Sequence, residues 1–180
     1  MVAMTPLVGP VADALVAKGV TVTAVRKLAQ GVALLGPALC MLALAAITPT
    51  PAAAVGGFSF VPAWLMGAST AAPPNPAVVV GLMSLAFGLS AWSRAGLYCN
   101  HQDLSPRYAS LLLGISNTAG ALPGVLGVWA AGVLLDATSS WSLALFLPTA
   151  LAQVVGTIVF SLFASGEEQG WEKEGEAGGG

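Results

Sequence analysis

The residue of this sequence best suited to binding a ligand is Arg94, a guanidinium set inside a long apolar stretch. A planar guanidinium fork can bind two oxygens of a carboxylate or phosphate at once. Leu97, Tyr98 and His101 follow Arg94 at helical spacing, which predicts one shared helical face. Two interpretations stay open: contact with an anion, or a structural role in which Arg94 forms an ion pair or snorkels to a membrane interface.

A second group of polar residues follows at once, in a predicted turn at 100–107 that contains His101, Asp103 and Arg107. Asp103 and Arg107 are four residues apart, so they are expected to pair, or Asp103 caps the next helix. An exposed pair of this kind contributes little to stability. The turn is therefore either a structural hairpin or a gate at the mouth of a pathway.

A third polar side chain, Asn117, lies among small residues on one predicted helical face. This face consists of Gly114, Asn117, Ala121 and Gly124. Gly120 and Gly124 form a G-x-x-x-G pattern, which allows close helix contact in lipid. The amide of Asn117 is costly to expose to hydrocarbon, so it should face a neighbour or a cavity. The face is either a packing seam or the lining of a cavity, on a helix bent at Pro123, that offers Asn117 to a polar solute.

Other chemistry finds little support in the sequence. A single His, no nucleophile elbow and no phosphate-binding loop argue against an enzyme. Cys40 and Cys99 lie in or beside apolar runs and show no metal-ligand or disulfide spacing. We therefore expect no catalytic residues, no metal and no resident cofactor. The net charge of −2 gives no reason to expect nucleic acid as a partner.

The elements that position these residues follow from composition. Only 8% of the residues are charged, against about 25% in soluble domains. Formal charges are absent from 28–93, 108–135 and 137–166. Since a membrane helix needs about 20 apolar residues, we predict an all-α, multi-pass transmembrane helix bundle with the lipid bilayer as a partner. An insoluble product of a misassigned reading frame is also compatible with the composition.

The charge-free runs divide the chain into segments. Four spans are predicted at 28–47, 77–99, 108–135 and 141–164, forming a transmembrane domain at 28–164. The other segments are the end of a truncated membrane helix at 1–17 (or a short surface helix), a cytoplasmic link at 18–27, a non-cytoplasmic loop at 48–76 and a disordered acidic tail at 165–180. The basic residues concentrate at 18–27 and 100–107, which places both links and the tail in the cytoplasm.

Several strings in this sequence resemble one family. They are the strings at 100–120, 163–167, 10–13, 25–27 and 34–37. The first closely resembles the junction of the tenth and eleventh helices in the anion:cation symporters of the major facilitator superfamily. That family includes sodium/phosphate cotransporters, sialin, vesicular glutamate transporters and plant anion (phosphate) transporters. His101-Gln102-Asp103 and Asn117-Thr118-Ala119-Gly120 resemble the plant members.

The resemblance implies the C-terminal half of a major facilitator transporter, with the four spans as helices nine to twelve and Met1–Ala17 as the end of helix eight. It implies alternating access, an anionic solute such as inorganic phosphate or a small organic anion, and coupling to a proton or sodium ion. A plastid or endomembrane location follows from the plant-type strings. Arg94, Asn117 and Tyr98 are then candidates for binding the anion, and His101, Asp103 and Arg107 for the cytoplasmic gate.

Two departures from the family limit what can be transferred. The family has about seven and a half helices before the part that this sequence resembles, so the chain needs a missing N-terminal half as a partner to form a complete path. Arg94 stands where the family has an uncharged residue, so its role cannot be carried over. The alternative hypothesis is a transport-incompetent truncated protein, or a structural membrane subunit that needs a partner half.

Overall fold

The computed structural model describes residues 5–51 and 73–166. Within these ranges every regular element is a helix. In chain order the helices are α1 (Thr5–Ala17), α2 (Val22–Ile47), α4 (Pro76–Leu89), η2 (Ser90–Trp92), η3 (Arg94–Tyr98), α5 (Cys99–Leu104), α6 (Ala109–Thr138), η4 (Ser142–Phe146) and α7 (Leu147–Phe163). The short segment η2 is a 3-10 helix, whereas η3 and η4 are π-helical.

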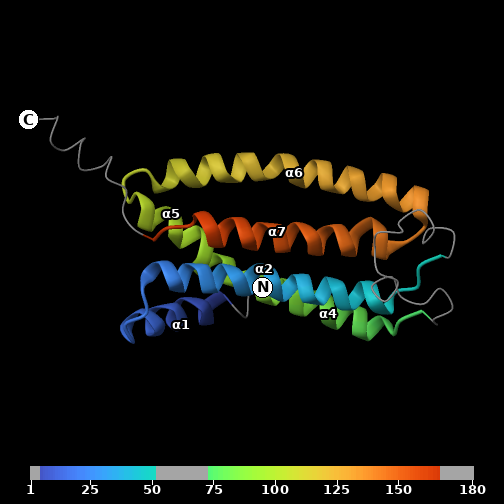
Figure 1. Ribbon diagram of the computed structural model, residues 1–180, viewed down its shortest axis with the longest axis horizontal. Coiled ribbons are helices and arrows are strands. Elements are labelled where there is room, and N and C mark those ends of the chain that lie inside the picture. The colour runs from blue at the N-terminus through green and yellow to red at the C-terminus, as the bar shows by residue number, and fades with distance from the viewer. Residues whose placement is uncertain (1–4, 52–72, 167–180) are drawn as a thin grey trace, which may run out of the picture.

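Four helical stretches among the described residues are long and apolar enough to cross a membrane. They are Val22–Ile47, Pro76–Leu104, Ala109–Thr138 and Ser142–Phe163. Figure 1 shows these stretches running lengthwise in one bundle, with α1 beside the first half of α2. The chain is thus an all-α helical membrane bundle, which confirms the predicted fold class.

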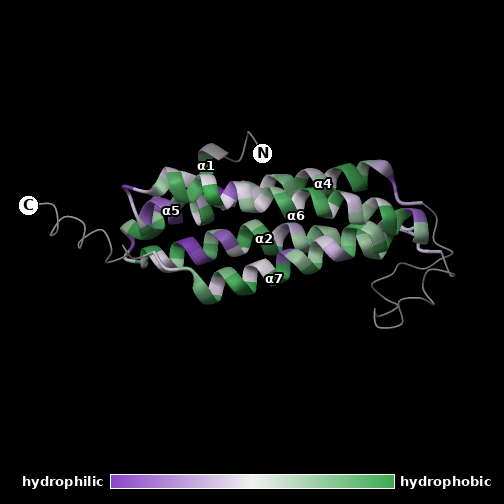
Figure 2. Cartoon of the chain, turned by 90° about the horizontal axis from the view of Figure 1, so that it is seen from above, coloured by the Kyte–Doolittle hydropathy of each residue, from purple (hydrophilic) through white to green (hydrophobic). Residues whose placement is uncertain are grey.

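The two basic links lie at the same end of the bundle. In Figure 1 the α1–α2 link, the α5–α6 link and the end of α7 are together, opposite the α6–α7 link. Figure 2 shows the hydrophilic residues of α5 and of the beginning of α2 at that same end. The two basic links share one end because two membrane helices, Val22–Ile47 and Pro76–Leu104, separate them along the chain.

The predicted link at 18–27 is too long, because α2 already begins at Val22. Thr21 caps this helix: its hydroxyl oxygen accepts a hydrogen bond from the Ala24 amide at 3.3 Å. The sequence prediction treated the charged side chains of Arg26 and Lys27 as the mark of a link. Arg and Lys are good helix formers, however, so charge alone does not end a helix.

The second membrane helix also extends further than predicted. Its helical structure continues through η3 and α5 to Leu104, so the predicted turn at 100–107 is reduced to residues 105–108. At its other end Asn75 caps α4, accepting a hydrogen bond from the Ala77 amide at 2.9 Å. Most of the predicted 48–76 loop and of the 165–180 tail lies outside the described residues.

The core of the bundle surrounds α2. One buried cluster consists of Ala38, Cys40, Met41, Leu44, Ala45, Ala86, Phe146 and Ala150. These residues come from α2, α4, η4 and α7, so α2 is packed between the second and the fourth membrane helices. Gly36 permits a close crossing, because an added Cβ there would lie 2.7 Å from Cδ1 of Leu89. Since lipid gives no hydrophobic drive for association, such close packing holds membrane helices together.

Helix α6 packs differently from the other three membrane helices. None of its residues is buried among the described parts of the chain, and its main contacts are with α5 at one end and η4 at the other. A Cβ added at Gly114, Gly120 or Gly124 would meet no described atom within 4 Å. The predicted packing seam therefore meets no neighbour in the described structure, because the middle of α6 lies away from the helices that surround α2 (Figure 1).

Candidate functional site

The candidate site is built around η3, the π-helical turn that carries Arg94. The second membrane helix passes from α4 through η2 into η3 and returns to α-helix in α5. Short π-helical segments within α-helices occur frequently at functional sites. They also disturb the regular backbone pairing, and in a membrane every polar backbone group needs a partner inside the protein.

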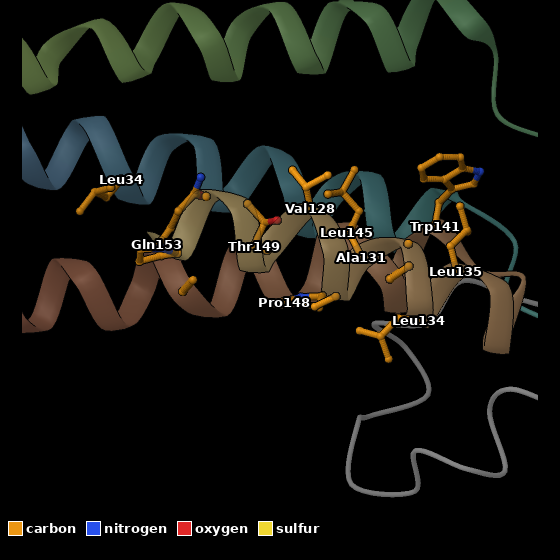
Figure 3. Close-up of a pocket in the computed structure, with 17 residues that line it drawn as sticks. Leu34, Val128, Ala131, Leu134, Leu135, Trp141, Leu145, Pro148, Thr149 and Gln153 are labelled. Atoms are coloured by element: carbon orange, nitrogen blue, oxygen red, sulfur yellow. The ribbon is translucent and has the colours of Figure 1, made fainter. Parts of the chain in front are cut away.

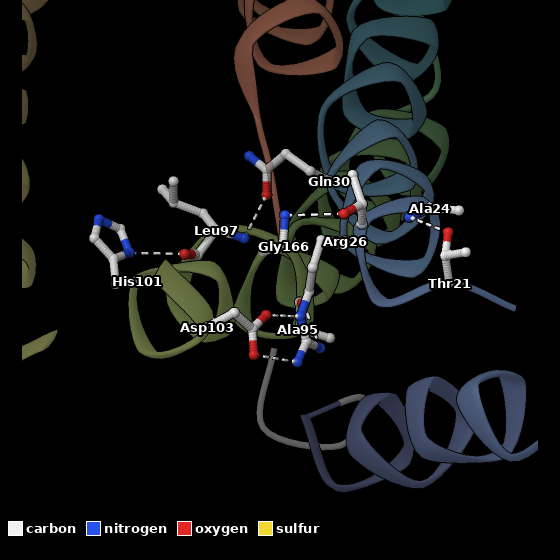
Figure 4. Close-up of polar contacts among 10 residues, drawn as sticks. Thr21, Ala24, Arg26, Gln30, Ala95, Leu97, His101, Asp103 and Gly166 are labelled. Carbon is white, nitrogen blue, oxygen red and sulfur yellow. Dashed lines mark hydrogen bonds and ion pairs between the residues drawn. The ribbon is translucent and has the colours of Figure 1, made fainter. Parts of the chain in front are cut away.

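Three side chains bind the backbone of this turn (Figure 4). Nη1 of Arg26 donates a hydrogen bond to the carbonyl oxygen of Ala95 at 3.1 Å. Oε1 of Gln30 accepts a hydrogen bond from the amide of Leu97 at 3.2 Å. Nδ1 of His101 lies 2.7 Å from the carbonyl oxygen of Leu97. Because Arg26 and Gln30 are one turn apart on α2, a single face of that helix holds the irregular turn.

Gln30 is the most deeply placed member of this group. Its side chain is 5% exposed, and its Oε1 also accepts a hydrogen bond from Oγ of Ser93 at 3.0 Å. Gly96 makes this approach sterically feasible, since an added Cβ there would lie 2.8 Å from the backbone nitrogen of Gln30. The two helices therefore cross at Gln30 and Gly96 with no room for a further side chain.

Asp103 forms its ion pair with Arg26. Nε of Arg26 lies 2.6 Å from Oδ2 of Asp103, and Nη2 donates to Oδ1 at 3.3 Å. The two side chains are only 15% and 21% exposed, and the paired geometry engages both carboxylate oxygens. From the sequence, Asp103 was expected either to pair with Arg107 or to cap the next helix. The guanidinium of Arg107 instead lies over the ring of Tyr108, 5.6 Å from its centroid.

The residues predicted to bind an anion do not form one cluster. Arg94 is exposed on η3, and Asn117 is exposed on α6. Tyr98 is 44% exposed and, together with His101, lines a pocket of about 440 Å³ between α5 and the beginning of α6. Neither Arg94 nor Asn117 lines that pocket. Of the face predicted from α-helical spacing, Tyr98 and His101 line one pocket, whereas Arg94 lies outside that pocket on the π-helical turn.

A larger groove lies between α6 and the beginning of the fourth membrane helix (Figure 3). Its volume is about 840 Å³, and Pro123, Gly124 and Leu34 contribute to a mainly apolar lining. The polar side chains Thr149 and Gln153 also line it. Oε1 of Gln153 is buried and accepts no hydrogen bond from a described residue. The groove is thus separate from the polar turn around Arg94.

Sequence reasoning missed Gln30, Ser93 and the role of Arg26. The signal for Gln30 was an amide inside an otherwise apolar predicted span, one helical turn beyond a basic residue. A polar side chain at such a position should be paired inside the protein. Its partners Ser93 and Leu97 are more than 60 residues away along the chain, so spacing along the sequence could not identify them.

No family model matches the chain. It is 40% identical to the Probable anion transporter 6, chloroplastic, of Arabidopsis thaliana, over 96% of this chain and 29% of the relative. It is 39% identical to the Ascorbate transporter, chloroplastic, of the same plant, over 89% of this chain and 24% of the relative. It is 38% identical to the Sodium-dependent phosphate transport protein 1, chloroplastic, also of A. thaliana, over 89% of this chain and 26% of the relative.

The helical bundle and its apolar spans define a multi-pass membrane protein. The relatives are plant anion and phosphate transporters, matched along nearly all of the described helices. The chain is related over most of its length to these transporters, which confirms the predicted resemblance to the anion:cation symporter family of the major facilitator superfamily. It spans 24–29% of the length of these three relatives, consistent with the C-terminal part of such a transporter.

Proposed function

We propose that this chain forms part of a transmembrane anion transporter that works by alternating access. The solute is inorganic phosphate or a small organic anion, and transport is coupled to a proton or sodium ion. Relatives named as anion, ascorbate and phosphate transporters support this proposal. The chloroplastic names of these relatives support a plastid membrane as the location. No step of the proposal requires an enzyme activity or a resident cofactor.

The observation that carries the proposal is Arg94, an exposed guanidinium on the irregular turn of the second membrane helix. A charged residue within a membrane span indicates function because hydrocarbon disfavours it. Arg is suited to oxyanions through its two parallel donors. Tyr98 and Asn117 supply a hydroxyl and an amide to the same solute, once an N-terminal partner half brings together the helices that carry them.

The gate is proposed at the basic end of the bundle. Arg26 joins the predicted gate residues His101, Asp103 and Arg107, because its ion pair with Asp103 links the beginning of α2 to α5. Such a link is strong when both groups are partly buried, and water reaching the pair weakens it. Opening and closing of the path at this end would change the solvation of the pair.

A second candidate function is a membrane subunit that transports nothing without a partner. Helix α6 favours it, because no residue of its membrane window is buried by the described parts of the chain. Small residues such as Gly120 and Gly124 on α6 suit close contact with a further helix. The two candidates differ in what the chain does when it is alone in a bilayer.

The decisive experiment compares the chain alone with a chimera in proteoliposomes. In the chimera this chain replaces the matching region of the Arabidopsis Probable anion transporter 6. Saturable uptake of phosphate, ascorbate or another anion by the chimera is the expected result. An inactive chimera beside an active parent would contradict the transport proposal. Uptake by the chain alone would contradict the partner-dependent candidate.

Arg94→Gln in the chimera tests the proposed anion contact. We expect the KM for the transported anion to rise about tenfold or more, because a charge-assisted hydrogen bond is lost. Arg94→Lys keeps the charge but loses the paired donors, so its KM should lie between those of the parent and of Arg94→Gln. Unchanged KM and maximal rate in Arg94→Gln would remove Arg94 from the site.

A further inference from the structure

Gln30 is buried, and its side-chain oxygen binds residues on both sides of Arg94. Oε1 of Gln30 accepts hydrogen bonds from Oγ of Ser93, which precedes Arg94, and from the amide of Leu97, which follows it by three residues. Arg26 adds a third contact, to the carbonyl oxygen of Ala95. The turn that carries Arg94 is therefore attached to α2 on both sides of the guanidinium-bearing residue.

The chemistry of the turn explains why such an attachment matters. A π-helical turn is much rarer than an α-helical one. Lipid offers no hydrogen-bond partners, so the backbone groups that such a turn leaves unpaired must bind other groups of the protein. An amide buried to 5% exposure is costly unless it is hydrogen-bonded. The two bonds to Oε1 thus stabilise both the buried Gln30 and the irregular turn. If they were lost, the turn would be free to rewind, which would rotate Arg94 relative to the rest of the helix.

The close crossing at Gly96 supports the same conclusion from sterics. An added Cβ on Gly96 would lie 2.7 Å from Oε1 and 2.8 Å from the backbone nitrogen of Gln30. Gly96 therefore lies directly against Gln30 with no room for a side chain, which leaves Gln30 and the turn little freedom to slide past each other. Not every glycine of this membrane helix lies so close to a neighbour, since a Cβ added at Gly81 would meet no described atom within 4 Å.

We propose that Gln30 is a positioning residue for Arg94: its carbonyl oxygen fixes the π-helical turn and thereby the direction in which the guanidinium meets the solute. The assignment rests on the proposed anion contact of Arg94. Gln30 itself does not contact the anion in this proposal, because its Oε1 is occupied by Ser93 and Leu97.

The test uses Gln30→Met, which keeps the length of the side chain but removes the acceptor, and Gln30→Glu, which keeps an acceptor oxygen at the same place. A matched control is Gln153→Met, since Oε1 of Gln153 accepts no hydrogen bond from the described residues. The first readout is amide hydrogen exchange at Leu97, measured by NMR on the labelled 180-residue chain in nanodiscs. The second is the KM and maximal rate of phosphate uptake by the chimera.

In Gln30→Met we expect exchange at Leu97 to become about tenfold faster, in line with the loss of one buried hydrogen bond. We expect a severalfold rise in KM with a nearly unchanged maximal rate. Gln30→Glu should restore slow exchange, and Gln153→Met should change neither quantity. A purely structural role would lower the maximal rate through loss of folded protein and leave KM unchanged.

The outcomes separate this proposal from the proposed function. Unchanged exchange at Leu97 in Gln30→Met overturns the positioning role, whatever the uptake shows. Faster exchange with an unaltered KM, while Arg94→Gln raises KM, also overturns it but leaves the anion contact of Arg94 standing. If Arg94→Gln itself leaves KM unchanged, the anion contact fails, and Gln30 is then shown to hold only the turn.

Discussion

At the scale of single residues, Arg26 is the centre of the polar end of the bundle. It pairs with both carboxylate oxygens of Asp103 and also donates to the carbonyl oxygen of Ala95. One side chain therefore joins α2 to both η3 and α5. Removing it leaves a partly buried carboxylate without its paired donor, which costs more than the loss of an exposed ion pair.

A pair of double-mutant cycles tests which basic residue Asp103 depends on. The first combines Arg26→Gln with Asp103→Asn, and the second combines Arg107→Gln with Asp103→Asn. We expect a coupling of about 1–3 kcal/mol in the first cycle, from a charge-assisted pair, and a much smaller coupling in the second. Thermal unfolding of the purified chain in detergent provides the free energies. A larger coupling for Arg107 would contradict the geometry of the ion pair.

The sequence identified Arg94 and Asp103 as notable because charge is rare in an apolar chain. It could not identify the partner of Asp103, because Arg26 lies 77 residues away. Local spacing offered Arg107 as a partner at helical distance, and the turn between Asp103 and Arg107 breaks the helix on which that argument depended. Residue type and local spacing were sufficient to single out the polar residues. Which of them form hydrogen bonds and ion pairs depends on how α2 crosses the second membrane helix.

At the scale of elements, the irregular second membrane helix is the main departure from what the pattern predicts. The apolar run and Pro76 correctly indicate a helix that begins near that residue. Apart from Gly96, no local residue marks Arg94–Tyr98 as π-helical. The turn is bonded to Gln30 and Arg26, which lie far away along the chain, and the close approach that Gly96 allows is evident only beside α2.

Two glycine substitutions measure how much this crossing contributes. Gly96→Ala places a methyl group against the backbone of α2, so we expect a loss of about 1–3 kcal/mol of unfolding free energy. Gly114→Ala is the matched control on α6, where an added Cβ meets no described atom. Alanine's helix propensity should make that variant neutral, or more stable by up to about 1 kcal/mol. Both are measured by thermal unfolding in detergent, and equal effects at the two sites would refute the close crossing.

At the scale of the whole molecule, hydropathy was sufficient to predict an all-helical membrane bundle. Each apolar run is long enough to cross a bilayer, and the fold class follows from that constraint. The position of α6 could not be predicted in the same way. Its small-residue face indicates a tight contact, but a sequence pattern does not say which helix makes that contact. Among the described residues, no helix packs along its middle.

The arrangement of the spans leads to a prediction about the sides of the membrane. Three spans separate Lys18 from Ser139, so these residues should lie on opposite sides, whereas two separate Lys18 from Pro106, so those should share one side. The basic links should lie on the cytoplasmic side of the membrane, or on the equivalent side of an organelle membrane, since Lys and Arg resist translocation. Single cysteines at these three positions, introduced with Cys40 and Cys99 replaced by Ala, can be labelled with a membrane-impermeant maleimide in sealed vesicles. We expect Lys18→Cys and Pro106→Cys to react from the same side and Ser139→Cys from the other. If Ser139→Cys reacts together with Lys18→Cys, one of the three intervening helices does not cross, and α6 is the first to suspect because it is the least packed.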